Sequence, residues 1–163
     1  MKNLNNKLKN FKIEIISHLK NLGLGESLKN GFEYCISKGK ADDIIISMDC
    51  DNSHTVQLSF KMLKSILINK KDIVIASRYK RNSKTKGLDS LRIFLSYGAA
   101  ILYKIFFPIK NVKDYTCGFR AYKVSIIQKA LEVFGNNFIQ IKGLGFSCTL
   151  EKILKTYIYE FSL

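Results

Sequence analysis

Two aspartates separated by one residue, Asp49 and Asp51, follow the short, mostly apolar run at 44–48. Carboxylates spaced in this way leave a strand on the same side, where both can bind one hard cation such as Mg²⁺ or Mn²⁺. A cation held there offsets the charge of a diphosphate leaving group. The alternative is a solvated turn at the strand end, or a helix N-cap formed by Asn52 or Ser53. The spacing alone leaves both interpretations open.

Arginine is rare in a chain that otherwise prefers lysine. The 27 basic residues include only four arginines, which are Arg78, Arg81, Arg92 and Arg120. A planar guanidinium binds phosphate oxygens through two parallel hydrogen bonds, which lysine does not do. Arg92 and Ser96 lie one helical turn apart, so together they could hold a phosphate. The alternatives are a solvent-facing Arg92 and, for Arg120, a structural ion pair with an acid such as Asp114.

Strand-like and helix-like patterns alternate along the chain. We expect strands at 11–17, 42–48, 72–77 and 157–161, and helices at 27–37, 55–69, 89–107, 124–134 and 143–155. The helix at 55–69 carries its apolar stripe at Val56, Phe60, Leu63, Ile66 and Leu67. The continuous apolar runs predict strands buried on both faces. This order predicts one α/β domain over 1–163 with a mainly parallel sheet, whose ligands gather at the carboxyl ends of the strands.

Composition narrows the class of protein and its location. The net charge is +14 over 163 residues, but the lysines are scattered, which favours solvated faces over a nucleic-acid-binding stripe. The four cysteines include no C-x-x-C pair, which favours reduced thiols in the cytoplasm. We expect a peripheral protein at an anionic membrane surface. The apolar segment 93–109 would rest in the membrane interface or, equally, form a core helix.

Five motifs in order carry a resemblance to a known family. They are NLGLGESLKNG, MDCDNSH, DIVIASRY, LRIFLSYGAAILY and KDYTCGFRAYK. Together they resemble glycosyltransferase family 2, in particular the dolichyl-phosphate (polyprenyl-phosphate) mannose synthases. The resemblance implies a GT-A type, Rossmann-like fold and a divalent metal, Mg²⁺ or Mn²⁺. It also implies inverting transfer of a hexose, mannose from GDP-mannose, to dolichyl or polyprenyl phosphate.

The resemblance also implies a role for each matched residue. By this resemblance, Asp49 and Asp51 bind the metal and the donor diphosphate, and Ser53 lies beside the metal. Phosphate groups fall to Arg78, Arg92 and Ser96. The turn beside the donor nucleotide is Asn21, Gly23 and Gly25, and the sugar pocket is lined by Asp114, Thr116, Gly118 and Arg120. A lipid phosphate is already an anionic nucleophile and needs no base; for a sugar hydroxyl acceptor, Asp114 is the one candidate base.

The match departs from the family pattern at both ends. The D-D-G-S motif that binds the nucleotide base is missing before residue 12, as is the later R-x-x-G-x-S-K segment. We therefore expect an incomplete N-terminal βαβ unit and marginal stability, unless a second polypeptide supplies the missing segments. Three alternatives remain: a transferase using UDP-glucose or another donor, an inactive fragment or accessory chain, and, more remotely, a nucleic-acid-binding module.

Overall fold

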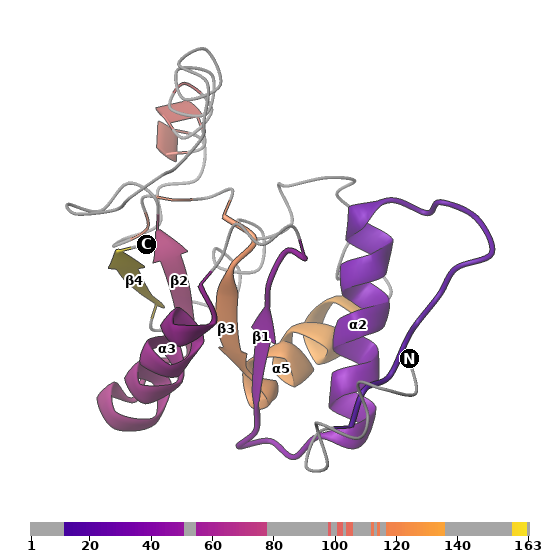
Figure 1. Cartoon of the computed structure of the whole chain (residues 1–163), viewed down its shortest axis with the longest axis horizontal. Coiled ribbons are helices and arrows are strands. Elements are labelled where there is room, and N and C mark those ends of the chain that lie inside the picture. The colour runs from indigo at the N-terminus through magenta and orange to yellow at the C-terminus, as the bar shows by residue number, and fades with distance from the viewer. Residues whose placement is uncertain are drawn as a thin grey trace.

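The structure is a computed structural model that describes residues 12–50, 55–77, 98, 101–102, 104–105, 112, 114 and 117–135, and the backbone of 158–162. Its helices are α2 (Leu24–Lys38), α3 (Val56–Asn69) and α5 (Val124–Phe134), and its strands are β1 (Ile44–Ser47), β2 (Ile73–Ser77), β3 (Arg120–Lys123) and β4 (Ile158–Ser162). Helices flank one sheet, so the predicted α/β class is confirmed (Figure 1).

The sheet has the order β1-β3-β2-β4 and is less parallel than predicted. Strand β3 pairs antiparallel with both β1 and β2, whereas β2 pairs parallel with β4. Strands β1, β2 and β4 therefore run in one direction, and β3 is inserted between β1 and β2 in the other. As a result, the carboxyl ends of β1 and β2 meet the amino end of β3 at the same end of the sheet.

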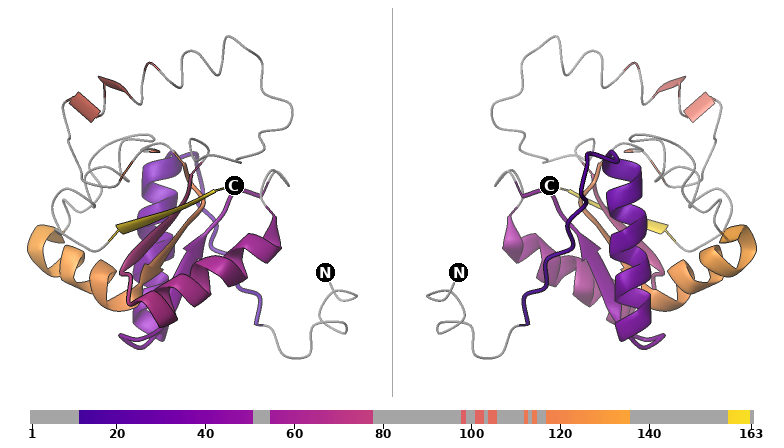
Figure 2. Two further views of the ribbon diagram at one scale, coloured as in Figure 1. Left: turned by 90° about the vertical axis from the view of Figure 1, so that its left-hand side faces the viewer. Right: turned by 90° about the vertical axis from the view of Figure 1, so that its right-hand side faces the viewer.

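The core lies between β2, β3 and the helices that cover them. All five residues of β2 are buried, as predicted. Helix α3 packs on β2 and β3 through Leu58, Met62 and Ile66. On the other side of the sheet α5 packs against α2 (Figure 2), and Phe32 of α2 meets Tyr122 of β3 edge-on at 5.4 Å between ring centroids.

Strand β1 differs from the prediction of a strand buried on both faces. Its four residues are only partly buried, because β1 forms one edge of the described sheet. The predicted strand at 11–17 is also wrong over its described residues, because 12–17 have no regular secondary structure. Ile13, Ile15 and Ile16 are exposed, so their alternating pattern serves no buried sheet face here.

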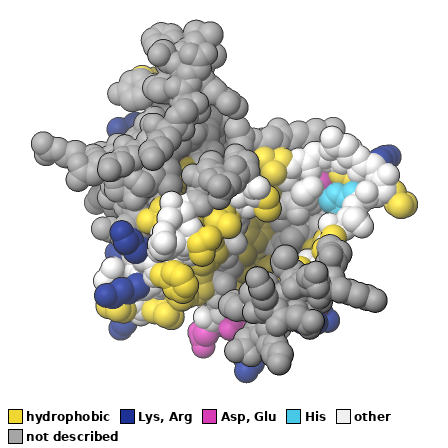
Figure 3. All heavy atoms as spheres, viewed as in Figure 1, with side chains coloured by type: hydrophobic (Ala, Val, Ile, Leu, Met, Phe, Trp, Pro, Cys, Tyr) yellow, Lys and Arg dark blue, Asp and Glu magenta, His cyan; other side chains and the backbone are white. Residues whose placement is uncertain are grey.

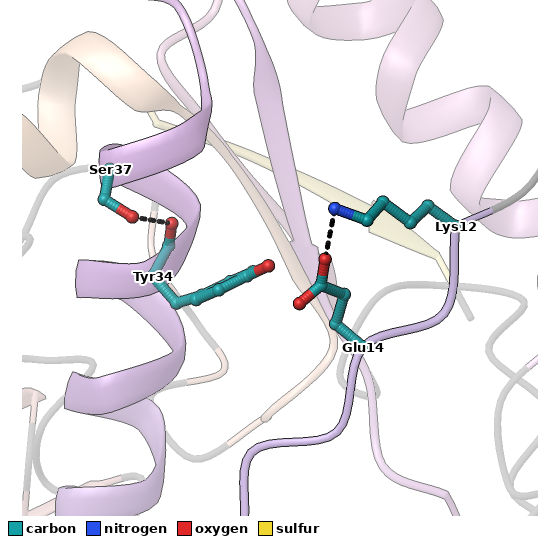
Figure 4. A network of polar contacts seen from close by, with 4 residues as sticks. All are labelled: Lys12, Glu14, Tyr34 and Ser37. Carbon is teal, nitrogen blue, oxygen red and sulfur yellow. Dashed lines mark hydrogen bonds and ion pairs between the residues drawn. The ribbon is translucent and has the colours of Figure 1, made fainter.

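The segment 12–22 instead follows α2 through polar contacts (Figure 1). His18 Nε2 lies 2.8 Å from Asn30 Nδ2 on the helix. Glu14 pairs with Lys12 and faces the Tyr34 side chain of α2 (Figure 4). The hydrogen bond from Lys12, followed by that from Tyr34, lowers the pKa of Glu14. The same contact with Glu14 raises the pKa of Tyr34.

This arrangement predicts that the pairing of Glu14 with Lys12, beside Tyr34 of α2, depends on pH. Because the folded-state pKa of Glu14 is lowered, its stabilising contribution is complete above the ordinary value of 4.5 and is lost as pH falls through the lowered value. We expect Lys12→Met to raise the pKa of Glu14 toward 4.5 in an NMR titration of the carboxyl group. Lys20→Met on the same segment is the control and leaves it unchanged. An unchanged Glu14 titration in Lys12→Met would contradict the contact.

Other predicted elements fall partly or wholly outside the described residues. The bounds of α3 and α5 agree with the predicted 55–69 and 124–134, and β4 overlaps the predicted 157–161. The described residues within 98–105 are helical, as expected of the helix at 89–107, and the helix at 143–155 lies outside the described residues. Within the described part, no helix has the length and apolarity needed to cross a bilayer.

Candidate active site

The acidic motif begins where β1 ends, at the end of the sheet where the carboxyl ends of β1 and β2 meet the amino end of β3. Asp49 follows Ser47, the last residue of β1, by two positions, and both Asp49 and Cys50 are exposed. Asp51 and Ser53, the other predicted metal-site residues, lie outside the described residues. The structure therefore places one of the two carboxylates and leaves their predicted sharing of a cation untested.

Gly118 lies directly against the Asp49 carboxylate. A Cβ atom built on Gly118 would be 3.4 Å from both Oδ1 and Oδ2 of Asp49. The two residues are 69 positions apart and belong to different predicted motifs, so the fold brings the acidic motif onto the D-x-T-x-G-F-R stretch. A side chain at position 118 would occupy space beside the carboxylate, which glycine leaves open to a ligand.

Ser47 fixes the position of Gly118, a role that the sequence analysis did not assign. Its Oγ donates a hydrogen bond to the Gly118 carbonyl at 2.7 Å and lies 3.5 Å from the Arg120 carbonyl. Strand pairing also joins Ser47 to Arg120. A serine at the end of an apolar run was the available signal, because a polar residue there can bond to a neighbouring loop.

Asp114 and residues 117–120, named here the 114–120 turn, are joined by hydrogen bonds and are mostly buried. Asp114 Oδ1 accepts a hydrogen bond from the Cys117 N–H at 3.0 Å. Arg120 donates through Nε to the Cys117 carbonyl at 2.7 Å and through Nη2 to the Asp114 carbonyl at 3.1 Å. Asp114 and Arg120 are both 0% exposed, so these charged side chains shape the turn on which Gly118 is carried.

The turn is also attached to the end of β2. The Cys117 thiol donates to the Ala76 carbonyl at 2.9 Å, and the Ala76 N–H donates to the Phe119 carbonyl at 3.0 Å. The buried Ser77 follows Ala76 and ends the strand. Two strand ends and one turn therefore converge, as expected of ligand sites in α/β sheets.

The described contacts of Arg120 are structural. The described contacts of its guanidinium go to backbone carbonyls of the turn, and they are the contacts of a residue that holds a loop. The predicted lining of a sugar pocket by Asp114 and Arg120, and catalysis by Asp114, stay predictions.

The NLGLG turn leads into helix α2 through a glycine with a positive φ. Gly23 has a φ of +85°, a conformation that favours glycine, and its N–H donates to Asn21 Oδ1 at 2.9 Å. The Gly23 carbonyl accepts from both the N–H and Oγ of Ser27, and Gly25 is buried in the first turn of α2. In Figure 1 this turn lies at the same end of the molecule as the carboxyl end of β1.

Several predicted phosphate and sugar contacts are not placed. Arg78, Arg92, Ser96 and Thr116 lie outside the described residues. Within the described part of the chain, no group of three or more His, Cys, Asp or Glu side chains could hold a metal. The exposed Asp49 carboxylate is of the ligand type that Mg²⁺ and Mn²⁺ prefer, and it would supply at most two of the oxygen ligands.

Comparison with known proteins supplies the family. Residues 1–131 match the model of glycosyl transferase family 2. The chain is 26% identical over 146 residues to a dolichol-phosphate mannosyltransferase of Pyrococcus furiosus, covering 89% of this chain and 37% of that protein. It is 28% identical over 124 residues to an undecaprenyl-phosphate mannosyltransferase of Micrococcus luteus, covering 76% of this chain and 47% of the relative.

A third relative agrees with the first two. The chain is 25% identical over 118 residues to a polyprenol monophosphomannose synthase of Mycolicibacterium smegmatis, covering 72% of this chain and 43% of the relative. The chain thus spans less than half the length of these three curated relatives. Because the family model covers most of the chain and the α/β fold agrees with the GT-A type, the chain belongs to glycosyl transferase family 2.

Proposed function

We propose that this chain carries the donor-binding part of a glycosyltransferase that moves mannose from GDP-mannose to a polyprenyl phosphate such as dolichyl phosphate, with inversion. The observation that supports this best is the contact of the Asp49 carboxylate with Gly118 at the carboxyl end of β1. It joins two family motifs in one place, in a chain whose curated relatives are named mannosyltransferases of dolichol, undecaprenyl or polyprenol phosphates.

The chemistry requires orientation and charge compensation more than proton transfer. The acceptor phosphate is already anionic, so the site has to align it and reduce its repulsion with the donor diphosphate. Asp49, with Asp51 and Ser53, would hold Mg²⁺ or Mn²⁺, which neutralises developing charge on the nucleoside diphosphate. Ser47 and the 114–120 turn hold Gly118 beside that carboxylate. Because glycine has no side chain, the space next to the carboxylate stays open.

The acceptor would be reached from a membrane surface on the cytoplasmic side. The described residues Ile101, Leu102 and Ile105 are exposed on a helical segment that includes Lys104. Exposed apolar side chains beside lysine are typical of a helix in the membrane interface. This supports a peripheral enzyme.

A lipid-extraction assay tests the proposal. The full chain is incubated with radiolabelled GDP-mannose, a polyprenyl phosphate and Mn²⁺, and label in the organic phase is counted. Label transfer that EDTA abolishes is expected, and more product from radiolabelled UDP-glucose than from GDP-mannose would assign the alternative donor. Donor binding in calorimetry without transfer would identify an accessory chain. The absence of both donor binding and transfer would reject the donor site.

A further inference from the structure

Helix α3 exposes apolar side chains on the face turned away from the core. Val56, Phe60 and Leu67 are 60%, 67% and 63% exposed in the whole chain. With the partly buried Leu63 they follow the spacing 4-3-4, so they form one stripe along the helix. The residues that pack on the sheet are instead Leu58, Met62, Ser65 and Ile66.

This result corrects the sequence analysis. The stripe predicted to face the core, Val56, Phe60, Leu63 and Leu67, faces outward, and of the predicted set only Ile66 is buried. A helix that is apolar on both faces is normally covered on both. The outward stripe of α3 is therefore an unusual surface for an isolated soluble domain.

Positive charge borders the stripe. Lys61 and Lys64 are exposed beside it, and α3 contains no acidic residue. Figure 3 shows hydrophobic and basic side chains next to each other over the part of the surface where α3 lies. Lys70 and Lys71 follow the helix directly.

The lysine side of the helix is also hollowed. A pocket of about 210 Å³ is lined by Lys61, Lys64, Ser65, Ile68 and Asn69. The two exposed ammonium groups beside this hollow are suited to a phosphate headgroup, whereas Ser65 is buried and accepts a hydrogen bond from the Asn69 amide. The neighbouring apolar stripe is suited to acyl chains.

We propose that the outward face of α3, defined by Val56, Phe60, Leu67, Lys61 and Lys64, binds an anionic lipid surface. An apolar stripe edged by lysine is the arrangement by which interfacial helices bind such membranes. A second copy of the chain fits less well, because a two-fold contact would bring lysines together with no carboxylate on α3 to compensate. The proposal needs no sugar donor and stands apart from the transferase reaction.

A vesicle-binding experiment with matched variants tests this surface. The full chain is mixed with phosphatidylcholine vesicles with and without phosphatidylglycerol, and the bound fraction is measured by co-sedimentation. Phe60→Ser/Lys64→Glu on α3 is compared with Val133→Ser/Lys129→Glu on α5, which changes the same charge at exposed positions with the same spacing. We expect the α3 variant to lose on the order of 30-fold in partitioning to anionic vesicles, and the α5 variant to bind as wild type does.

A fluorescence probe gives an independent readout, because the chain contains no tryptophan. In Phe60→Trp, emission should shift to shorter wavelength on anionic vesicles and be quenched by brominated lipid, whereas Val133→Trp should show neither effect. Equal binding of both double variants, no binding of wild type to anionic vesicles, or equal quenching at both positions would overturn the proposal. A lipid-independent dimer that Phe60→Ser abolishes would overturn it in favour of a second copy.

Discussion

Replacing Asp49 by Asn is expected to lower the rate of mannose transfer by about 10²–10³-fold, since losing one group that stabilises transition-state charge costs several kcal/mol. The substitution keeps the size of the side chain and removes its charge. The carboxylate beside Gly118 is placed to act on a cation and a diphosphate, so donor affinity in the presence of Mn²⁺ should fall as well. Rates from the lipid-extraction assay and titration calorimetry with GDP-mannose measure both effects.

Asp42→Asn is the matched control for this prediction. Asp42 is exposed and lies before β1, at the opposite end of the strand from Asp49. The Asp42→Asn substitution changes the net charge by the same amount as Asp49→Asn but lies away from the site, so we expect wild-type activity. Equal activity of the two variants would remove Asp49 from the site. Loss of transfer with unchanged Mn²⁺-dependent donor binding would instead separate Asp49 from the metal.

Gly118→Ala tests the same contact from the other side. Its added Cβ would lie 3.4 Å from both carboxylate oxygens of Asp49, in van der Waals contact, and would fill the space that a ligand beside the carboxylate needs. We therefore expect the transfer rate to fall while the free energy of unfolding changes little, because the position is only partly buried. A variant with full activity would show that the space beside Asp49 is not used.

The sequence predicted correctly those elements whose apolar pattern is compatible with only one secondary structure and one buried face. Strand β2 is a continuous apolar run and is buried throughout, as such a run requires. Helix α5 was predicted with its observed bounds, because Gly135 follows the apolar pattern and ends the helix with a φ of +52°. The convergence of Asp49 with the turn of Gly118 followed only from the family resemblance, since residues so far apart share no local signal.

Other elements could not be predicted, for physical reasons that the structure makes clear. Strand β3 has the sequence RAYK, in which two basic residues give no apolar strand pattern. Its arginine is nevertheless buried, because its guanidinium donates hydrogen bonds to backbone carbonyls. Periodicity could not choose the inner face of α3, because both faces are apolar and the buried one contains Ser65. For residues 12–17 the alternation was correct for a strand, but a strand also needs a ladder partner, which local sequence does not reveal.

Two basic residues of β3 allow a direct comparison of buried and exposed charge. Arg120 is fully buried and donates to the carbonyls of Asp114 and Cys117. Lys123, three residues later, is partly exposed and pairs with Asp72 at 2.8 Å. Removing Arg120 leaves buried carbonyls without these donors, and each unsatisfied buried group costs about 1–3 kcal/mol. Removing Lys123 breaks a partly solvated ion pair worth at most about 1 kcal/mol.

We therefore expect Arg120→Met to lower the free energy of unfolding by about 3–5 kcal/mol, and Lys123→Met to lower it by no more than about 1 kcal/mol. Urea unfolding followed by circular dichroism measures both. Arg120→Lys keeps the charge but lacks the planar fork that reaches two carbonyls, so its stability should lie nearer to Arg120→Met than to wild type. If Arg120→Met unfolds as wild type does but binds GDP-mannose more weakly, the guanidinium acts on the sugar donor. If it unfolds early, as the buried hydrogen bonds indicate, Arg120 supports catalysis by holding the turn that sets Gly118 against Asp49.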